Sequence, residues 1–145
     1  MIYLDNAATT YPKPESVYDA VLDCMKNYCA NPGRAGHKLA MRAAREIYDT
    51  RENLAKLFNI DNPMNIVFTS NATDSLNLAI KGSVTEGDHI ITTSMEHNSV
   101  IRPIKALEKN GVENTIVNCD KDVFLDYEEL ENAIRSEEHT SELQS

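Results

Sequence analysis

Apolar positions recur at helical spacing in the first part of the chain. Over residues 15–28 they are three or four places apart, at Val17, Val21, Leu22 and Met25. This spacing predicts a helix that begins near Pro14. A longer stripe over 37–58, with Arg and Glu on its other side, predicts a second helix. The sequence ANPGRAG between them is too rich in Pro and Gly for regular structure.

Beyond residue 63 short apolar runs alternate with helical stripes. The pattern predicts strands at 65–69, 89–93 and 114–119, and helices at 74–81, 98–109 and 126–134. The strands are continuously apolar, which is typical of parallel strands covered by helices on both faces. The predicted fold class is therefore α/β, with a mainly parallel sheet. Three strands are few for such a sheet, so we expect a truncated domain.

The last eleven residues, RSEEHTSELQS at 135–145, contain one aliphatic residue and no apolar period. This string resembles the translation of a sequencing adapter, and we expect a non-native tail. The alternative is a natural, solvated acidic end of the preceding helix. The expected organisation is an N-terminal arm at 1–13, a main domain at 14–134 and the tail at 135–145.

Composition and charge exclude several function classes. The chain has 145 residues, enough for one domain with its own core, and no apolar run long enough to span a membrane. Its net charge of −9 disfavours nucleic acid as a partner, since phosphate backbones bind clusters of Lys and Arg. The first residues do not resemble a secretion signal, and we expect a cytoplasmic protein.

Cysteine usage does not indicate a metal site or a disulfide framework. The three cysteines are Cys24, Cys29 and Cys119. An odd number in a reducing compartment favours free thiols. Cys24 and Cys29 are five positions apart on a predicted helix, so they do not share a face as two metal ligands would. No metal is expected.

The join between the first predicted strand and its helix consists of small and polar residues. The first-turn amides of Asn71, Ala72 and Thr73 would be unpaired within the helix and would lie at the positive end of its dipole. Such a turn suits a phosphate, and the Thr73 hydroxyl can donate one more hydrogen bond. The alternative, favoured by residue preferences alone, is that Asn71 or Thr73 caps the helix.

A second polar turn follows the next predicted strand, at the same edge of the sheet. In it His97 stands directly before a helix, beside a carboxylate. An imidazole in this place could stack on a planar ligand or transfer a proton. The alternative is a histidine that belongs to the cap region and packs on the sheet. The glycine-rich loops of dinucleotide and P-loop sites are absent from the sequence.

Four motifs occur in order along the chain: YLDNAATT at 3–10, ANPGRAGH at 30–37, FTSNATDSLN at 68–77 and SMEHNS at 94–99. Together they resemble the N-terminal part of the class V, fold-type I pyridoxal-phosphate enzymes, in particular the cysteine desulfurase group. The resemblance covers residues 1–134. It implies the three-layer large domain of that fold type, truncated here, with pyridoxal 5'-phosphate as cofactor.

The resemblance also implies roles for single residues. Ala72 and Thr73 match a pair whose amides and hydroxyl hold the cofactor phosphate, with Asn71 where the family usually has Gly. His97 matches a histidine that stacks on the pyridine ring and takes part in proton movements. The arm residues Ala7, Ala8 and Thr9 resemble a segment near the substrate. The family's Schiff-base lysine, pyridine-nitrogen aspartate, carboxylate-binding arginine and nucleophilic cysteine have no counterpart here.

The function implied for the full-length parent is a cysteine desulfurase. Such an enzyme converts L-cysteine to L-alanine, holds the sulfur as a persulfide and passes it to a sulfur-acceptor protein; the parent is expected to be a homodimer. The alternatives are a class V aminotransferase, a selenocysteine lyase and a non-catalytic phosphate-binding fragment. The chain itself is expected to be inactive without the lysine.

Overall fold

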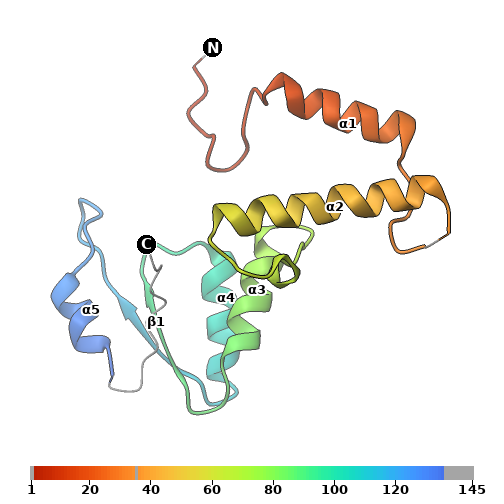
Figure 1. Cartoon of the computed structure of the whole chain (residues 1–145). Helices are drawn as coiled ribbons and strands as arrows, with labels where there is room; N and C mark the ends of the chain where they lie inside the picture. Colours follow the sequence, from red (N-terminus) through yellow and green to blue (C-terminus); the bar gives the residue numbers. More distant parts are fainter. Residues whose placement is uncertain (1, 35, 136–145) are drawn as a thin grey trace. The chain divides into compact units, whose positions relative to one another are not determined.

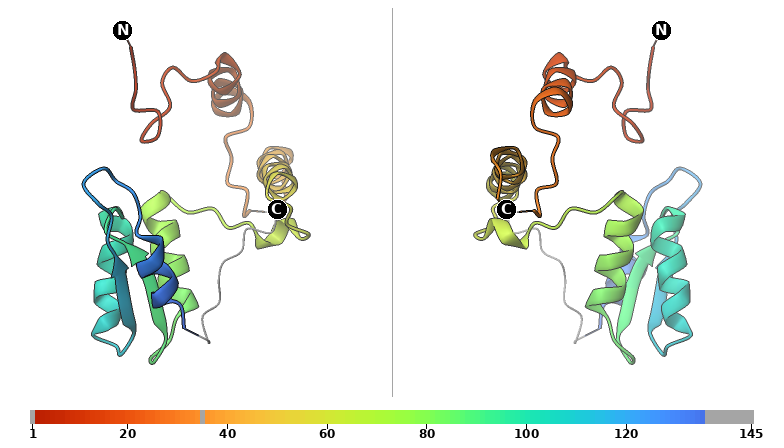
Figure 2. Two further views of the ribbon diagram at one scale, coloured as in Figure 1. Left: turned by 90° about the vertical axis from the view of Figure 1, so that its left-hand side faces the viewer. Right: turned by 90° about the vertical axis from the view of Figure 1, so that its right-hand side faces the viewer.

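The computed structural model describes residues 2–34 and 36–135. It divides into two compact units, one that ends at Val67 and one that begins at Phe68. Each unit is described below by itself. Figures 1 and 2 show their helices and strands.

The first unit contains two α-helices and a short 3-10 helix. These are α1 (Glu15–Asn27), α2 (Lys38–Leu57) and η1 (Pro63–Asn65). Pro14 precedes α1, and its ring fixes the backbone φ where the helix begins. His37 caps α2, because its Nδ1 accepts a hydrogen bond from the Ala40 amide at 3.3 Å. The sequence pattern predicted both α-helices correctly to within one or two residues.

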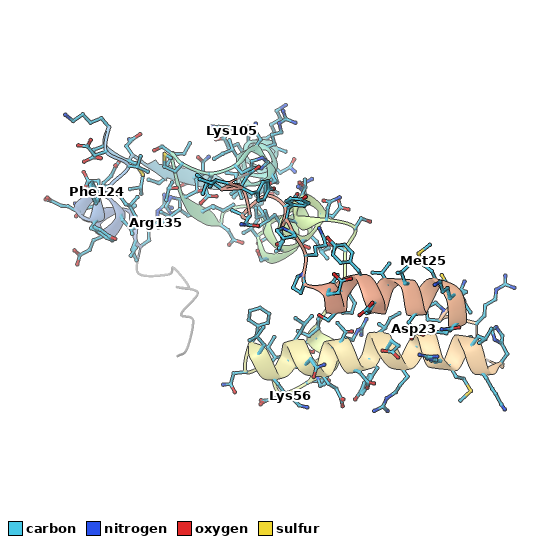
Figure 3. All side chains as sticks on the ribbon, turned by 90° about the horizontal axis from the view of Figure 1, so that it is seen from above. Asp23, Met25, Lys56, Lys105, Phe124 and Arg135 are labelled. Atoms are coloured by element: carbon cyan, nitrogen blue, oxygen red, sulfur yellow. The ribbon has the colours of Figure 1, made fainter. Side chains whose placement is uncertain are left out.

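An ion pair joins α1 to α2. Nη2 of Arg42 lies 2.7 Å from Oδ2 of Asp23, and the guanidinium carbon of Arg42 lies 3.9 Å from the centre of the buried Tyr28 ring. Figure 3 shows Asp23 on the side of α1 that faces α2, with Met25 on the opposite side. Both charged side chains are about half exposed, so the ion pair contributes at most about 1 kcal/mol to stability. It orients the two helices more than it stabilises them.

The second unit alternates helices and strands. Its elements are α3 (Ala72–Ser83), β1 (His89–Thr93), α4 (Asn98–Glu108), β2 (Glu113–Val117) and α5 (Tyr127–Ala133). The strands pair in parallel, from His89 opposite Glu113 to Thr93 opposite Val117. Figures 1 and 2 show α3 and α4 side by side on one face of the strands and α5 on the other. The predicted α/β class, with a parallel sheet and helices on both faces, is confirmed.

The core of the second unit lies between the strands and α4. Val117 is fully buried, and Ile104 and Val112 are 3% and 4% exposed. Pro103 is also buried, inside α4. A proline there leaves a carbonyl of the preceding turn without its usual helical donor. The helix therefore depends on this packing more than an uninterrupted helix would.

The strand predicted at 65–69 is wrong. Pro63–Asn65 forms η1, and residues 66–69 form no strand in the described part of the chain. Val67 and Phe68 are 64% and 46% exposed, whereas the sequence pattern predicted a buried strand. A strand is defined by hydrogen bonds to a neighbouring strand, and in residues 2–34 and 36–135 only β1 and β2 are paired in this way.

The predicted tail lies almost wholly outside the described residues. Only Arg135 is described, and its Nη2 lies 2.5 Å from Oε2 of Glu113. Within the described residues, no helix combines the length and the apolar character needed to cross a membrane.

The end of α4 generates a prediction about acid stability. Hydrogen bonds from Lys105, at 2.9 Å, and from Asn114 of β2 lower the pKa of Glu108 from its ordinary value of 4.5. A lowered pKa in the folded state means that the carboxylate stabilises the fold above pH 4.5. This contribution is lost as the pH falls through the lowered pKa.

We expect Glu108→Gln to lower the urea midpoint of unfolding at pH 7, and the difference from the parent chain to shrink at about pH 3. The matched control is Glu131→Gln on the exposed side of α5. A difference that is the same at both pH values would contradict this account of Glu108.

Candidate functional site

The first turn of α3 keeps two backbone amides available. Asn71 caps the helix, since its Oδ1 accepts a hydrogen bond from the Asp74 amide at 2.9 Å. No hydrogen bond from the amides of Ala72 and Thr73 is found among the described residues, as is usual for the first positions of a helix. All four side chains are exposed. The cap and an anion site are thus compatible, because the cap uses only the third amide of the turn.

The first turn of α4 is capped by a histidine. Nδ1 of His97 accepts a hydrogen bond from the Ser99 amide at 3.1 Å and lies 2.8 Å from Oγ of Ser99. The imidazole is exposed, whereas Ser99 is only 8% exposed. The contacts on one ring nitrogen therefore leave the other edge of the ring free to meet a ligand.

Asn77 connects these two helix starts. Its Nδ2 donates to the carbonyl oxygen of Thr73 at 2.9 Å and lies 3.5 Å from the carbonyl oxygen of Ser99. The helices α3 and α4 pack against each other, and the contact of Asn77 with Ser99 places their first turns at the same end of the pair. The turn that carries Thr73 and the turn that carries His97 are neighbours in the folded unit.

The loops that follow the two strands are also joined at this edge. The Ser94 amide donates to the carbonyl oxygen of Val117 at 2.9 Å, and Oγ of Ser94 accepts from the Cys119 amide at 3.0 Å. These bonds continue the pairing of β1 and β2 beyond the last strand residues. Ligands of open α/β sheets bind at this edge, beyond the carboxyl ends of the strands.

The structure brings some of the predicted site residues together. Ala72, Thr73 and His97 share one edge of the second unit through the contacts of Asn77. The arm residues Ala7, Ala8 and Thr9 belong to the first unit, so their place near a substrate stays a prediction. They form an exposed turn, in which the Ala8 and Thr9 amides both donate to the Asp5 carbonyl oxygen.

Sequence reasoning missed Asn77 and Ser99. A signal for Asn77 was present, because it lies four residues after Thr73 and such residues meet on one face of a helix. Ser99 lies two residues after His97, which is the spacing of a short side-chain to backbone cap. Among the described residues, no group of three or more His, Cys, Asp or Glu side chains is placed to hold a metal ion.

Substitution of Asn71 removes the helix cap and leaves the backbone amides of Ala72 and Thr73 in place. We expect Asn71→Ala to destabilise the second unit by about 1 kcal/mol, because the Asp74 amide loses its acceptor. Asn71→Gly should cost only a few tenths of a kcal/mol. Urea unfolding, together with hydrogen exchange of the α3 amides, measures both effects. An Asn71→Ala variant as stable as the parent chain would show that the Asn71 side chain does not act as a helix cap.

Comparisons with known proteins agree with this architecture. The chain is 38% identical over 140 residues to the cysteine desulfurase IscS of Neisseria meningitidis serogroup C, an alignment that covers 94% of this chain and 34% of that protein. It is 39% identical over 142 residues to the cysteine desulfurase IscS of Pseudoalteromonas translucida. The chain spans about a third of the length of these curated relatives.

Solved structures give the same result. The apo structure of a cysteine desulfurase from Thermococcus onnurineus NA1 matches with a TM-score of 0.79 and 31% identity, over 91% of this chain and 34% of that chain. A NifS-like protein matches with a TM-score of 0.78 and 30% identity, over 93% of this chain and 37% of the other. The family model of the aminotransferases of class V matches residues 2–142. The chain therefore belongs to the class V aminotransferase family.

Proposed function

We propose that this chain is the N-terminal part of a pyridoxal-phosphate-dependent cysteine desulfurase. The observation that carries the proposal is the contact of Asn77 with the carbonyl oxygens of Thr73 and Ser99. It brings the turn with two available amides beside the turn that carries the exposed imidazole of His97. One turn would hold the cofactor phosphate and the other would meet the cofactor ring. The names of the relatives and solved structures support the same assignment.

The start of α3 fits a phosphate group. The amides of Ala72 and Thr73 can donate to phosphate oxygens at the positive end of the helix dipole. The Thr73 hydroxyl is exposed and can donate as well, and the methyl group of Ala72 lets a ligand approach the backbone. Asn71 would border the phosphate as the helix cap. Asp74 in the same turn is exposed, so solvent screens its charge.

His97 fits the second part of the site. With Nδ1 occupied by the contacts of Ser99, the exposed ring can lie against a planar pyridine ring and hold a proton at Nε2. When bound, pyridoxal 5'-phosphate supplies an electron sink for bonds at the substrate α-carbon. The part of this chain is to bind the phosphate, orient the ring and hold that proton. Ala7, Ala8 and Thr9 are proposed to border the substrate.

The complete reaction is proposed for a longer protein, since the chain spans about a third of its relatives. That protein would act in the cytoplasm on L-cysteine, as a homodimer, and pass sulfur to an acceptor protein. A class V aminotransferase or a selenocysteine lyase would use the same phosphate turn, so these are the alternative reactions of the longer protein. For the chain itself, the alternative is a non-catalytic phosphate-binding fragment. The chain alone is proposed to be inactive, and residues 135–145 to be a non-native tail.

Replacement of Thr73 tests the phosphate turn. We expect Thr73→Val to weaken binding of pyridoxine 5'-phosphate to the 145-residue chain about tenfold, because one hydrogen bond to a charged group is lost. Pyridoxine, which lacks the phosphate, should bind both chains equally. Neither probe has an aldehyde, so neither reacts with surface lysines. Titration calorimetry measures the affinities.

Thr73→Ser is the matched control for this experiment, since it keeps the hydroxyl and should bind pyridoxine 5'-phosphate like the parent chain. If Thr73→Val weakened both probes by the same factor, the phosphate would not be held by this turn.

The reaction itself is tested on the complete protein. The source DNA is sequenced beyond codon 134, and the continuous reading frame is expressed. We expect the complete protein, with pyridoxal 5'-phosphate and a thiol reductant, to form L-alanine and sulfide in equal amounts from L-cysteine. The 145-residue chain should form neither. In a parallel assay with pyruvate as amino-group acceptor, formation of the keto acid of cysteine without sulfide would favour the aminotransferase. A reading frame that stops after residue 145 would contradict the proposed tail.

A further inference from the structure

Ser99 makes two contacts with one nitrogen atom of His97. Its backbone amide donates to Nδ1 at 3.1 Å, and its Oγ lies 2.8 Å from the same Nδ1. A backbone N–H can only donate a hydrogen bond, so Nδ1 must be the acceptor in this geometry. A neutral imidazole then carries its proton on Nε2.

Ser99 is itself held in place. It is 8% exposed, and its carbonyl oxygen lies 3.5 Å from Nδ2 of Asn77. The same Nδ2 donates to the Thr73 carbonyl oxygen at 2.9 Å. A chain of polar contacts therefore runs from the phosphate turn through Asn77 and Ser99 to the imidazole.

The hydroxyl of Ser99 adds something that the amide cannot supply. One hydrogen bond leaves an exposed imidazole free to turn about it, whereas two donors that converge on Nδ1 from one residue fix the ring plane as well as the proton position. Ser99 is buried, whereas the His97 ring is exposed. The hydroxyl of Ser99 therefore provides a fixed contact that orients the ring.

We propose that Ser99 is a positioning residue for His97, which it holds in one ring orientation with the proton on Nε2. The proposal rests on the proposed function, because it assigns the free edge of His97 to the cofactor ring. The Ser99 hydroxyl need not touch the cofactor itself. Its removal should nevertheless weaken binding of the pyridine ring and leave the contribution of the phosphate to binding unchanged.

The proton position is measured on the full 145-residue chain. Long-range proton–nitrogen NMR spectra of the 15N-labelled chain, at a pH where imidazole is neutral, distinguish a protonated ring nitrogen from an unprotonated one. The His97 signals are identified by their loss in His97→Gln. In the parent chain we expect Nδ1 to be unprotonated and Nε2 protonated. A neutral ring with its proton on Nδ1 would overturn the proposal without any Ser99 variant.

Two variants then test the hydroxyl. Without the hydroxyl the exposed ring can turn away from the Ser99 amide, so Ser99→Ala should shift the His97 nitrogen signals towards an average over both proton positions. Ser99→Thr should restore the signals of the parent chain. His37, which caps α2 through its own Nδ1, is an internal control whose signals should not move. Unchanged His97 signals in Ser99→Ala would overturn the proposal, as would a failure of Ser99→Thr to restore them.

Ligand binding provides the second measurement. We expect Ser99→Ala to weaken pyridoxine and pyridoxine 5'-phosphate by the same factor, about fivefold, because only the ring contact is affected. Loss of affinity for pyridoxine 5'-phosphate alone would overturn the proposal. A signal shift in a chain that binds neither probe would support the positioning of His97 by Ser99 and would contradict the proposed cofactor site instead.

Discussion

The parallel pairing of β1 with β2 is the constraint on which the arrangement of the second unit depends. Two strands that run in the same direction cannot be joined by a tight turn, so the chain returns through α4 along one face of the sheet. Each helix that returns in this way begins at the carboxyl edge of the strands. No strand precedes α3 in the described residues, but α3 packs beside α4 and Asn77 lies close to the Ser99 carbonyl oxygen, so the positive ends of both helices lie at this edge. Ser94 joins the loops that follow the two strands there.

Much of this arrangement could be predicted from the sequence. Short segments around the aliphatic pairs Ile90–Ile91 and Ile116–Val117 predicted β1 and β2, and helical spacing predicted the helices around them. Small and polar residues before α3 and α4 led to the prediction of a ligand site, which stays a prediction. The likeness to a known family added the roles proposed for Ala72, Thr73 and His97, which the pattern alone left open between binding and capping. In the structure Asn71 and His97 are caps, and capping leaves the neighbouring groups available.

The remainder depended on contacts that a pattern does not contain. The stretch 66–69 has the composition of a strand, but strand structure requires a hydrogen-bonded neighbour, and none is found among the described residues. In the sequence Asn77 is an ordinary polar residue of a helix. Its contact with the Ser99 carbonyl oxygen depends on the packing of α3 against α4. Ser99 became distinctive through its burial beside an exposed ring, and burial follows from tertiary structure.

The caps of the last four α-helices have a consequence for the order in which the chain acquires structure. His37, Asn71, His97 and Asp126 each accept a hydrogen bond from an amide two or three residues further along. Bonds of such short range need no distant partner, and those of His37, Asn71 and His97 involve residues that are synthesised before β2. Neighbouring residues thus mark where these helices start, whereas helices as short as α3, α4 and α5 become stable only when they pack in the folded unit.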